Sequence, residues 1–368
     1  MFSSDLPRLP IVSLGTYRPS QEVLRLVAEI DEFKGAWRAL RNIAPERLSA
    51  LRRVATIESV GSSTRIEGVT LTNAQIELLL SGLETRSFTS RDEEEVAGYA
   101  ALMETIFSSW QYLPLTENQI KQLHGILLKY SSKDERHRGY YKTLSNNVEA
   151  FGPEGESLGI VFETASPFDT PFQMAALVSE TRESLEAGLV HPLLLIAAFV
   201  VRFLAIHPFQ DGNGRLSRAL TTLLLLRSGY SYVPYASLES IVEENKESYY
   251  LALRRTQGTL KSTQGTLSSD VPDWEPWVTF FARTLHTQKS RLERKIEREQ
   301  LLEGDLPELS IRILELARER GRVKSSEILI LTGEKPGTVR NRLNELVERG
   351  LLNRHGKGPA TWYTLGIS

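Results

Sequence analysis

The sequence predicts a mainly α-helical fold with a small β-hairpin and a separate C-terminal unit. Three observations lead to this fold class. Apolar residues recur with helical spacing over residues 22–112, and the apolar run from Leu193 to Ile206 has the character of a buried helix. Residues 139–168 instead carry β-forming side chains around a Gly/Pro/Asn turn, which favours a hairpin or strand-like flap. Residues 306–368 show short helical patterns followed by two strand-like ones.

The helices can be placed in order along the chain. The pattern over residues 22–112 breaks near Pro45 and at Gly82, and Thr116 predicts the start of a helix that runs to Tyr130. Further helices are expected at residues 171–187, 192–205, 214–227 and 242–257, with another that begins at Trp274. The charged segment after it, residues 286–305, is predicted to be a helix or a linker.

Composition limits the classes of function. The 368 residues suffice for two or three domains, and 41% hydrophobic with 24% charged residues is typical of a soluble globular protein. Cysteine is absent, which excludes disulfides, thiol catalysis and cysteine-ligated metals. A net charge of −2 gives no global attraction to nucleic acid or membranes, so any such function must be local.

The sequence shows no targeting signal. The N-terminus lacks the basic and apolar regions of a signal peptide. The longest apolar run contains Arg202 and is shorter than the roughly 18 residues that a membrane helix needs. We therefore expect a cytoplasmic protein with no membrane partner.

The apolar run ends in a polar cluster, "IHPFQDGNGRLSRAL", that predicts a phosphate site. Gly212-Asn213-Gly214 can adopt a turn that directs successive backbone N–H groups into one concavity, at the N-terminus of the next helix. Such a helix end binds anions through unpaired N–H groups and its positive dipole end. Arg215 and Arg218, three residues apart on one helical face, can reach further phosphate oxygens.

Two more residues of this cluster suggest a reaction. Asp211 offers a hard oxygen ligand suited to Mg²⁺, which usually binds one carboxylate together with substrate phosphates. His207 stands just before the loop and can take a proton near neutral pH. Considered alone, His207 is better explained as a core histidine before a glycine-rich turn, but the whole set favours phosphoryl or nucleotidyl transfer. The other histidines show no metal-ligand spacing and are assigned no catalytic role.

The stretch "HPFQDGNGRLSR" resembles the active-site signature of Fic-domain proteins, H-x-F-x-[DE]-G-N-G-R-x-x-R, with every fixed position present. The resemblance extends over residues 50–285. It implies a Fic-type helical core that transfers AMP from ATP–Mg²⁺ to a Ser, Thr or Tyr hydroxyl of a target protein, or of the protein itself, releasing pyrophosphate.

The resemblance also implies a role for each residue of the signature. His207 would be the general base on the target hydroxyl, and Asp211 would hold Mg²⁺ between the α- and β-phosphates. Gly212, Asn213 and Gly214 would form the anion hole, and the arginines at 215 and 218 would bind the triphosphate of ATP.

Two weaker features agree with the family. "ENKESYYLAL" resembles the segment that flanks the adenine, so Tyr249 and Tyr250 either line a nucleotide pocket or simply pack between helices. Residues 139–168 resemble the family's flap, which holds the target's backbone by strand addition. The family often has G-x-Y-R at the start of the flap, whereas this chain has "GYYK" at residues 139–142, so the choice of target stays open.

A second stretch, "SVGSSTRIEGVTLT", has the pattern [ST]-x-x-x-E-[GN] at residues 63–68. Ser63 and Glu67 would share one helical face, and Gly68 would end the helix. By itself this pattern describes a surface turn, but beside the Fic signature it resembles the inhibitory motif of the self-inhibited class. A Glu67 carboxylate paired with Arg218 would occupy the guanidinium meant for the γ-phosphate. In some relatives the same glutamate helps to remove AMP, so a de-AMPylase, or transfer of another phosphate-containing group, is an alternative.

The C-terminal residues are predicted to form a winged helix-turn-helix, with Lys335–Arg349 as recognition helix and Asn353–Thr361 as wing. Residues 306–368 hold 11 Lys/Arg against 7 Asp/Glu, a local charge of +4. DNA binding through this unit, with the Fic core as an ATP sensor, is therefore a further hypothesis, and protein contact or dimerisation is its alternative. The residues proposed to face DNA are Thr338, Arg340, Asn341, Asn344, Arg354 and Lys357.

The predicted organisation has four parts. They are an N-terminal helical region carrying the inhibitory motif (1–110), a Fic catalytic core (111–285), a charged helix or linker (286–305) and a winged helix-turn-helix (306–368). A homodimer is compatible with the resemblance, although no residue pattern indicates it.

Overall fold

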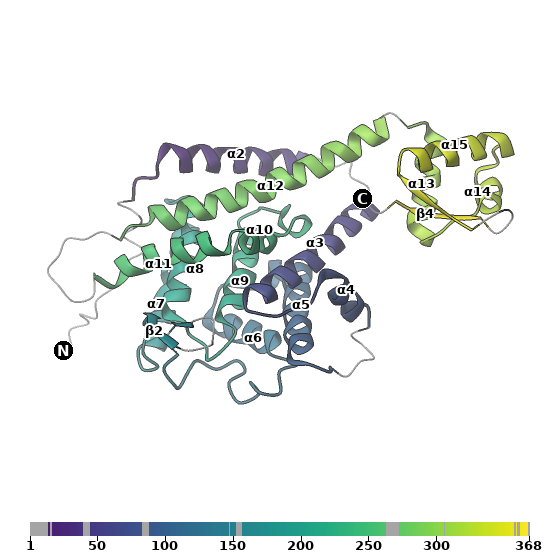
Figure 1. The fold of residues 1–368 in the computed structure, drawn as a ribbon. Helices are drawn as coiled ribbons and strands as arrows, with labels where there is room; N and C mark the ends of the chain where they lie inside the picture. Colours follow the sequence, from purple (N-terminus) through teal and green to yellow (C-terminus); the bar gives the residue numbers. More distant parts are fainter. Residues whose placement is uncertain are drawn as a thin grey trace, which may run out of the picture. The chain divides into compact units, whose positions relative to one another are not determined.

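The computed structural model describes residues 14, 17–39, 45–82, 88–146, 148–151, 157–262, 272–304, 306–356, 358 and 361–366. The chain divides into two compact units, Met1–Leu292 and Glu293–Ser368. Helices dominate both units, and each contains one two-stranded antiparallel sheet (Figure 1). No helix within the described ranges is long and apolar enough to cross a membrane.

The first unit consists mainly of helices, and its last helix continues past Leu292 into the second unit. In order, they are α2 (Gln21–Ala39), α3 (Pro45–Ile66), α4 (Asn73–Ser81), α5 (Arg91–Ser109), η1 (Trp110–Tyr112), α6 (Glu117–Leu127), β1 (Val148–Phe151), β2 (Ser157–Phe162), α7 (Thr170–Ala187), α8 (Pro192–Ile206), α9 (Asn213–Arg227), η2 (Val233–Tyr235), α10 (Leu238–Glu244), α11 (Lys246–Ser262) and α12 (Glu275–Gly304).

Two expectations for these elements were wrong in detail, and a third was left between two alternatives. The helix predicted for residues 242–257 is two helices, α10 and α11, separated at Asn245, whose side chain donates to the Ile241 carbonyl at 2.8 Å. The charged segment, predicted to be a helix or a linker, is helical, because α12 continues through it to Gly304. The helix opened by Thr116 ends at Leu127 rather than Tyr130.

The core of the first unit is built around α8 and α9. Nearly every side chain of α8 is buried, and α8 packs against α7, α9 and α11, as expected for an apolar helix surrounded by others. Helix α9 packs against α3, α5 and α6. Trp277 of α12 is 2% exposed and donates through Nε1 to the Ala197 carbonyl at 2.7 Å. The loop between α8 and α9 is therefore held at the end of two rigid, buried helices.

Strands β1 and β2 form the hairpin that the sequence predicts within residues 139–168. They pair antiparallel, with Val148 opposite Phe162 and Phe151 opposite Ser157. The predicted turn between them, at residues 152–155, lies outside the described residues.

The second unit consists of three helices followed by two strands. They are α13 (Glu308–Arg320), α14 (Ser325–Thr332), α15 (Pro336–Glu348), β3 (Leu352–His355) and β4 (Trp362–Leu365). Its core contains Ile313, Ile328, Val339 and Leu346, all nearly inaccessible to water. Helix α15 coincides with the predicted recognition helix to within one residue at each end. Strands β3 and β4 lie at the two ends of the predicted wing. Lys357 of the wing lies outside the described residues.

Candidate active site

The loop between α8 and α9 begins and ends with a left-handed residue. His207 follows α8 with φ 53° and ψ 59°, and it is the one non-glycine residue with positive φ in the described part of the chain. Gly212 precedes α9 with φ 80°, where a Cβ atom would approach Leu127 Cδ2 to 3.0 Å. Only glycine enters this conformation without strain, so the loop needs glycine at 212.

The first N–H groups of α9 have no side-chain cap from the N-cap residue, Gly212, which has no side chain to offer. The Asn213 side chain does not enter this space, because its Oδ1 accepts from Phe209 N at 2.9 Å and its Nδ2 donates to Phe209 O at 2.7 Å. Asn213 thus closes the loop with its side chain and offers only its backbone N–H to a ligand.

A carboxylate already occupies this helix end. A Cβ atom added to Gly214 would lie 2.2 Å from Glu67 Oε1, so the Glu67 carboxylate rests directly on the Gly214 backbone. The same oxygen accepts from Arg218 Nη2 at 2.7 Å. Arg218 also donates to the Ser63 side chain at 2.8 Å and to the Ser63 carbonyl at 2.9 Å. Burial disfavours the charge on Arg218, but the Glu67 carboxylate outweighs this effect and raises the Arg218 pKa.

The segment that carries Glu67 is anchored on both sides. Helix α3 ends at Ile66, and Gly68 has φ 105°, the conformation expected of a helix-ending glycine. Before it, Arg65 forms a two-pronged ion pair with Glu243 of α10, at 2.7 and 2.9 Å. After it, the Thr70 N–H donates to Asp92 of α5 at 3.0 Å.

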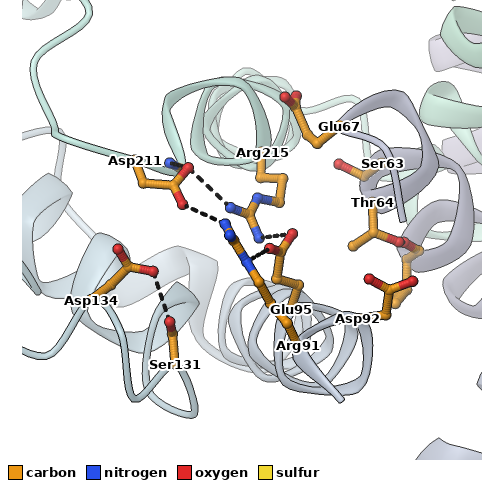
Figure 2. A network of polar contacts seen from close by, with 12 residues as sticks. Ser63, Thr64, Glu67, Arg91, Asp92, Glu95, Ser131, Asp134, Asp211 and Arg215 are labelled. Atoms are coloured by element: carbon orange, nitrogen blue, oxygen red, sulfur yellow. Dashed lines mark hydrogen bonds and ion pairs between the residues drawn. The ribbon is translucent and has the colours of Figure 1, made fainter. Parts of the chain in front are cut away.

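On the other side of α9, two carboxylates and two guanidinium groups form a closed ring (Figure 2). Asp211 accepts from Arg215 and from Arg91, each at 3.3 Å. Glu95 accepts from Arg215 at 2.8 Å and from Arg91 at 2.7 Å. Arg215 is 2% exposed, so its guanidinium is a buried part of the loop's support. The Arg215 Nε atom is buried without a hydrogen-bond partner.

His207 is neutral at physiological pH. Burial, reinforced by the positive charge of Lys142, lowers the His207 pKa to about 4, although the Leu204 backbone and the carboxylates of Glu67 and Asp211 oppose the shift. A neutral imidazole has one unprotonated ring nitrogen, which can accept a proton. The electrostatic requirement for a general base is therefore met.

Asp211 is the only candidate metal ligand of the predicted set. Its side chain is 36% exposed, and the described ranges contain no group of three or more His, Cys, Asp or Glu residues that could hold an ion. A single accessible carboxylate fits Mg²⁺ that arrives with a nucleotide, because such an ion takes most of its ligands from phosphates and water.

The two tyrosines of α11 differ in exposure. Tyr249 is 4% exposed, and its ring centroid lies 5.7 Å from that of Trp277 and 5.8 Å from that of Phe280. Tyr250 is 45% exposed. Packing accounts for Tyr249, and Tyr250 has the accessible ring.

Sequence reasoning missed His124, which supports the loop from α6. Its ring stacks on Phe209 with centroids 3.9 Å apart. Nδ1 accepts from the Gly139 N–H at 3.0 Å, so the neutral ring donates through Nε2 to the Asp211 carbonyl, also at 3.0 Å. Burial lowers the His124 pKa to about 4. His124 is 83 positions before His207 and carries no spacing signal. Lys142 and Asn146, which contact the same loop, were missed for the same reason.

The fold and the site define a class: an α-helical protein in which the loop between two central helices lies beside a glutamate carboxylate and contains a neutral histidine. Residues 114–225 match the family model "Fic/DOC family". Protein adenylyltransferase Fic of Drosophila virilis is 31% identical over 236 residues, which cover 62% of this chain and 44% of the relative. Protein adenylyltransferase Fic of Drosophila willistoni is 29% identical over 238 residues, which cover 62% of this chain and 42% of the relative. The chain thus spans less than half the length of these curated relatives.

Solved structures extend this similarity to most of the chain. A Fic family protein from Desulfovibrio desulfuricans G20 superposes with a TM-score of 0.60 at 25% identity, over 95% of this chain and 98% of that one. A Fic-domain-containing signaling protein from Bacteroides thetaiotaomicron gives 0.57 at 28% identity, over 71% and 94%. Residues 114–225 thus resemble the Fic/DOC family, the chain is similar to protein adenylyltransferase Fic, and the predicted fold class, a mainly helical Fic fold, is confirmed.

Proposed function

We propose that the protein is an adenylyltransferase that moves AMP from ATP to a Ser, Thr or Tyr hydroxyl of a target protein, or of itself, and that Glu67 inhibits this reaction. One observation carries the proposal: an anion, the Glu67 carboxylate, already rests on the N-terminus of α9 beside the neutral His207. The space that holds this carboxylate suits a phosphate, because both are anions attracted by the N–H groups of a helix end.

The chemistry follows from the residues around this helix end. The target oxygen attacks the α-phosphorus of ATP while its proton passes to His207, and the bond from that phosphorus to the pyrophosphate oxygen breaks. Backbone N–H groups at Gly212–Gly214 and the Arg218 guanidinium stabilise the phosphate oxygens.

Mg²⁺ fits this proposal through Asp211, whose carboxylate would hold it together with the nucleotide. The ion would neutralise phosphate charge. Arg91 and Arg215 contact that carboxylate, so Mg²⁺ binding would have to reorganise the ring.

The brake acts through competition for one guanidinium. Glu67 takes the Arg218 Nη2 that a γ-phosphate would need, and a second negative charge there repels the triphosphate. The contact of Glu67 with Gly214 also favours a second function, de-AMPylation: Glu67 would take a proton from water that attacks the phosphorus, and protonated His207 would return a proton to the leaving hydroxyl.

DNA binding by the second unit is a separate proposal. Arg340, Asn341 and Asn344 are exposed on α15, which suits a helix that reads a groove. Fluorescence anisotropy with a random duplex at low and higher salt tests it, since binding through phosphates must weaken as salt rises. If the affinity for the duplex does not change with salt, or if no binding is seen, the second unit is better explained as a site of protein contact or dimerisation.

The decisive experiment uses α-labelled ATP with Mg²⁺ and a cell lysate as the source of target. We compare wild type, Glu67→Gly and the double variant Glu67→Gly/His207→Ala. Label should appear on protein with the single variant, stay low with wild type and disappear with the double variant. Equal labelling by wild type and Glu67→Gly would refute the brake. Absence of label in all three would refute transfer of AMP, and release of AMP from a pre-modified target would then support the reverse reaction.

A further inference from the structure

Four consecutive backbone carbonyls surround His207, and one short segment satisfies all of them. Residues 142–146, between α6 and β1, supply each donor. The bonds run from Lys142 Nζ to Ile206 O (3.0 Å), from Asn146 Nδ2 to His207 O (3.4 Å), from the Lys142 backbone N–H to Pro208 O (2.9 Å) and from Asn146 Nδ2 to Phe209 O (2.6 Å). Lys142 thus grips the backbone on both sides of His207.

These hydrogen bonds stabilise an unfavourable backbone conformation at His207. His207 has φ 53°, a left-handed conformation that is unfavourable for a residue with a Cβ atom. Such a conformation persists only where several contacts with the surrounding structure hold it in place. Pro208 has no backbone N–H to donate, so neighbouring side chains hold residues 206–209 mainly through hydrogen bonds to their carbonyl oxygens.

The ammonium group of Lys142 is buried among neutral oxygens. The residue is 4% exposed, and besides Ile206 O its Nζ donates to Asn146 Oδ1 and Thr164 Oγ1, each at 2.8 Å. These three acceptors match the three protons of an ammonium, and none of them is a carboxylate. These three acceptors therefore do not neutralise the positive charge of Lys142, which can act on neighbouring ionisable groups such as His207. Burial lowers the Lys142 pKa to about 8, which still leaves it mostly charged at pH 7.

The same three acceptors connect His207 to the hairpin. Asn146 lies two residues before β1, and Thr164 lies two residues after β2. Thr164 also donates to Asn146 Oδ1 at 3.1 Å. The base of the hairpin and the backbone at His207 thus share one polar cluster centred on Lys142.

We propose that Lys142 is a positioning residue that fixes His207 in its left-handed conformation and ties it to the base of the hairpin. The proposal rests on the proposed function in treating His207 as the base. It adds that the Lys142 charge lowers the His207 pKa further, beyond the larger effect of burial. The charged groups that face His207 are Lys142, which opposes its protonation, and Glu67 and Asp211, which favour it. Removing Lys142 leaves only the two that favour protonation.

The first test follows the His207 pKa by NMR titration of the full-length protein, with His207→Ala to assign its signal. Wild type and Lys142→Arg should titrate near 4. Lys142→Met should titrate higher, by on the order of one unit. The control is Lys121→Met, which removes a nearby lysine that contacts the Tyr141 ring and does not bond the loop. An unchanged His207 pKa in Lys142→Met would overturn the proposal, as would an equal rise in the control. Should Lys142→Met fail to fold, Lys142→Gln, which is uncharged but can donate to Ile206 O, provides the same comparison.

The second test measures transfer in the Glu67→Gly background. Lys142→Met should lower kcat roughly 10- to 100-fold, the effect of misplacing a catalytic group, and should leave the Kd for ATP unchanged. Lys142→Arg, which keeps a charged donor, should recover most of the rate. A Kd that weakens as much as kcat falls would instead make Lys142 part of nucleotide binding and refute the positioning role. If Glu67→Gly with intact Lys142 transfers nothing, the proposed function fails, while the NMR titration still decides the role of Lys142.

Discussion

The two buried arginines of α9 are three residues apart and have different partners. Arg215 faces α5, where Glu95 is buried with a side chain that is 11% exposed. Arg218 faces the end of α3, where the Glu67 side chain is 31% exposed. The α5 side is a closed ring of four charged groups, whereas the α3 side is a pair at a helix end that water reaches.

This difference suggests that one arginine supports the fold of the loop and the other takes part in regulation. A buried guanidinium in a ring of ion pairs cannot lose a partner without leaving an uncompensated charge in the protein interior. A guanidinium paired with an accessible carboxylate can exchange it for another anion, since water or a phosphate can enter where the carboxylate leaves. We therefore expect the α5 side to hold the fold of the loop and the α3 side to regulate it.

Glu95→Ala should produce the largest loss of stability. It leaves Arg215 with only Asp211, at 3.3 Å, and should lower the free energy of unfolding by about 3 kcal/mol. Urea unfolding measures this loss. Glu104→Ala is the matched control on the same helix, because its partner Arg52 is on the surface and an exposed pair contributes less than about 1 kcal/mol. Equal losses in the two variants would show that the ring is not a support.

Acid should weaken the loop through His124. The buried ring has a folded pKa of about 4 against an ordinary value of 6.5, so the unfolded chain binds the extra proton first. Stability from this group is complete above pH 6.5 and is lost as pH falls toward 4, by about 2 kcal/mol at pH 4.5. His124→Asn should flatten the dependence of urea unfolding on pH between 6.5 and 4.5. An identical slope in wild type and variant would contradict the assignment.

Glu67→Ala should cost less stability than Glu95→Ala, about 2 kcal/mol, because Arg218 is buried but keeps two bonds to Ser63. The same substitution should tighten the binding of ATP, measured by calorimetry. Ser63→Ala is the comparison, since it removes a bond to Arg218 without removing negative charge. A large loss of stability with unchanged ATP affinity would make Glu67 a structural residue like Glu95 and erase the contrast between the two sides.

The helix pair was predictable because its signals are local. An apolar run with a polar cluster at its end locates α8, the loop and α9 to within one residue of the observed bounds. The boundary at Asn245 was missed because the helical apolar spacing continues across α10 and α11, and only a side-chain bond to Ile241 marks the break. The charged half of α12 was predicted only as a helix or a linker, and the structure shows the helix, which agrees with its good helix formers and its lack of a breaker.

The supporting residues were not predictable, because their signals are spread along the chain. Glu95 precedes Arg215, and Arg91 precedes Asp211, by 120 positions, and Lys142 contacts a carbonyl 64 positions away. Single-sequence spacing contains no information about such contacts. The roles of the signature residues came from a motif, whereas the residues that hold them emerged only from the folded structure.

Arg91→Ala should have the smallest effect on stability, within about 0.5 kcal/mol, because the Arg91 side chain is 53% exposed. It should nevertheless release one oxygen of Asp211, and the Mg²⁺ concentration at which ATP binding is half maximal should fall a few-fold, roughly the value of one exposed ion pair. Calorimetric titrations of ATP at stepped Mg²⁺ concentrations measure this shift, with Arg53→Ala as the control, since Arg53 pairs with Glu77 on the surface. A requirement for more Mg²⁺ would mean that Arg91 helps to bind the nucleotide, and the ring on the α5 side would then belong to the ligand site as well as to the fold.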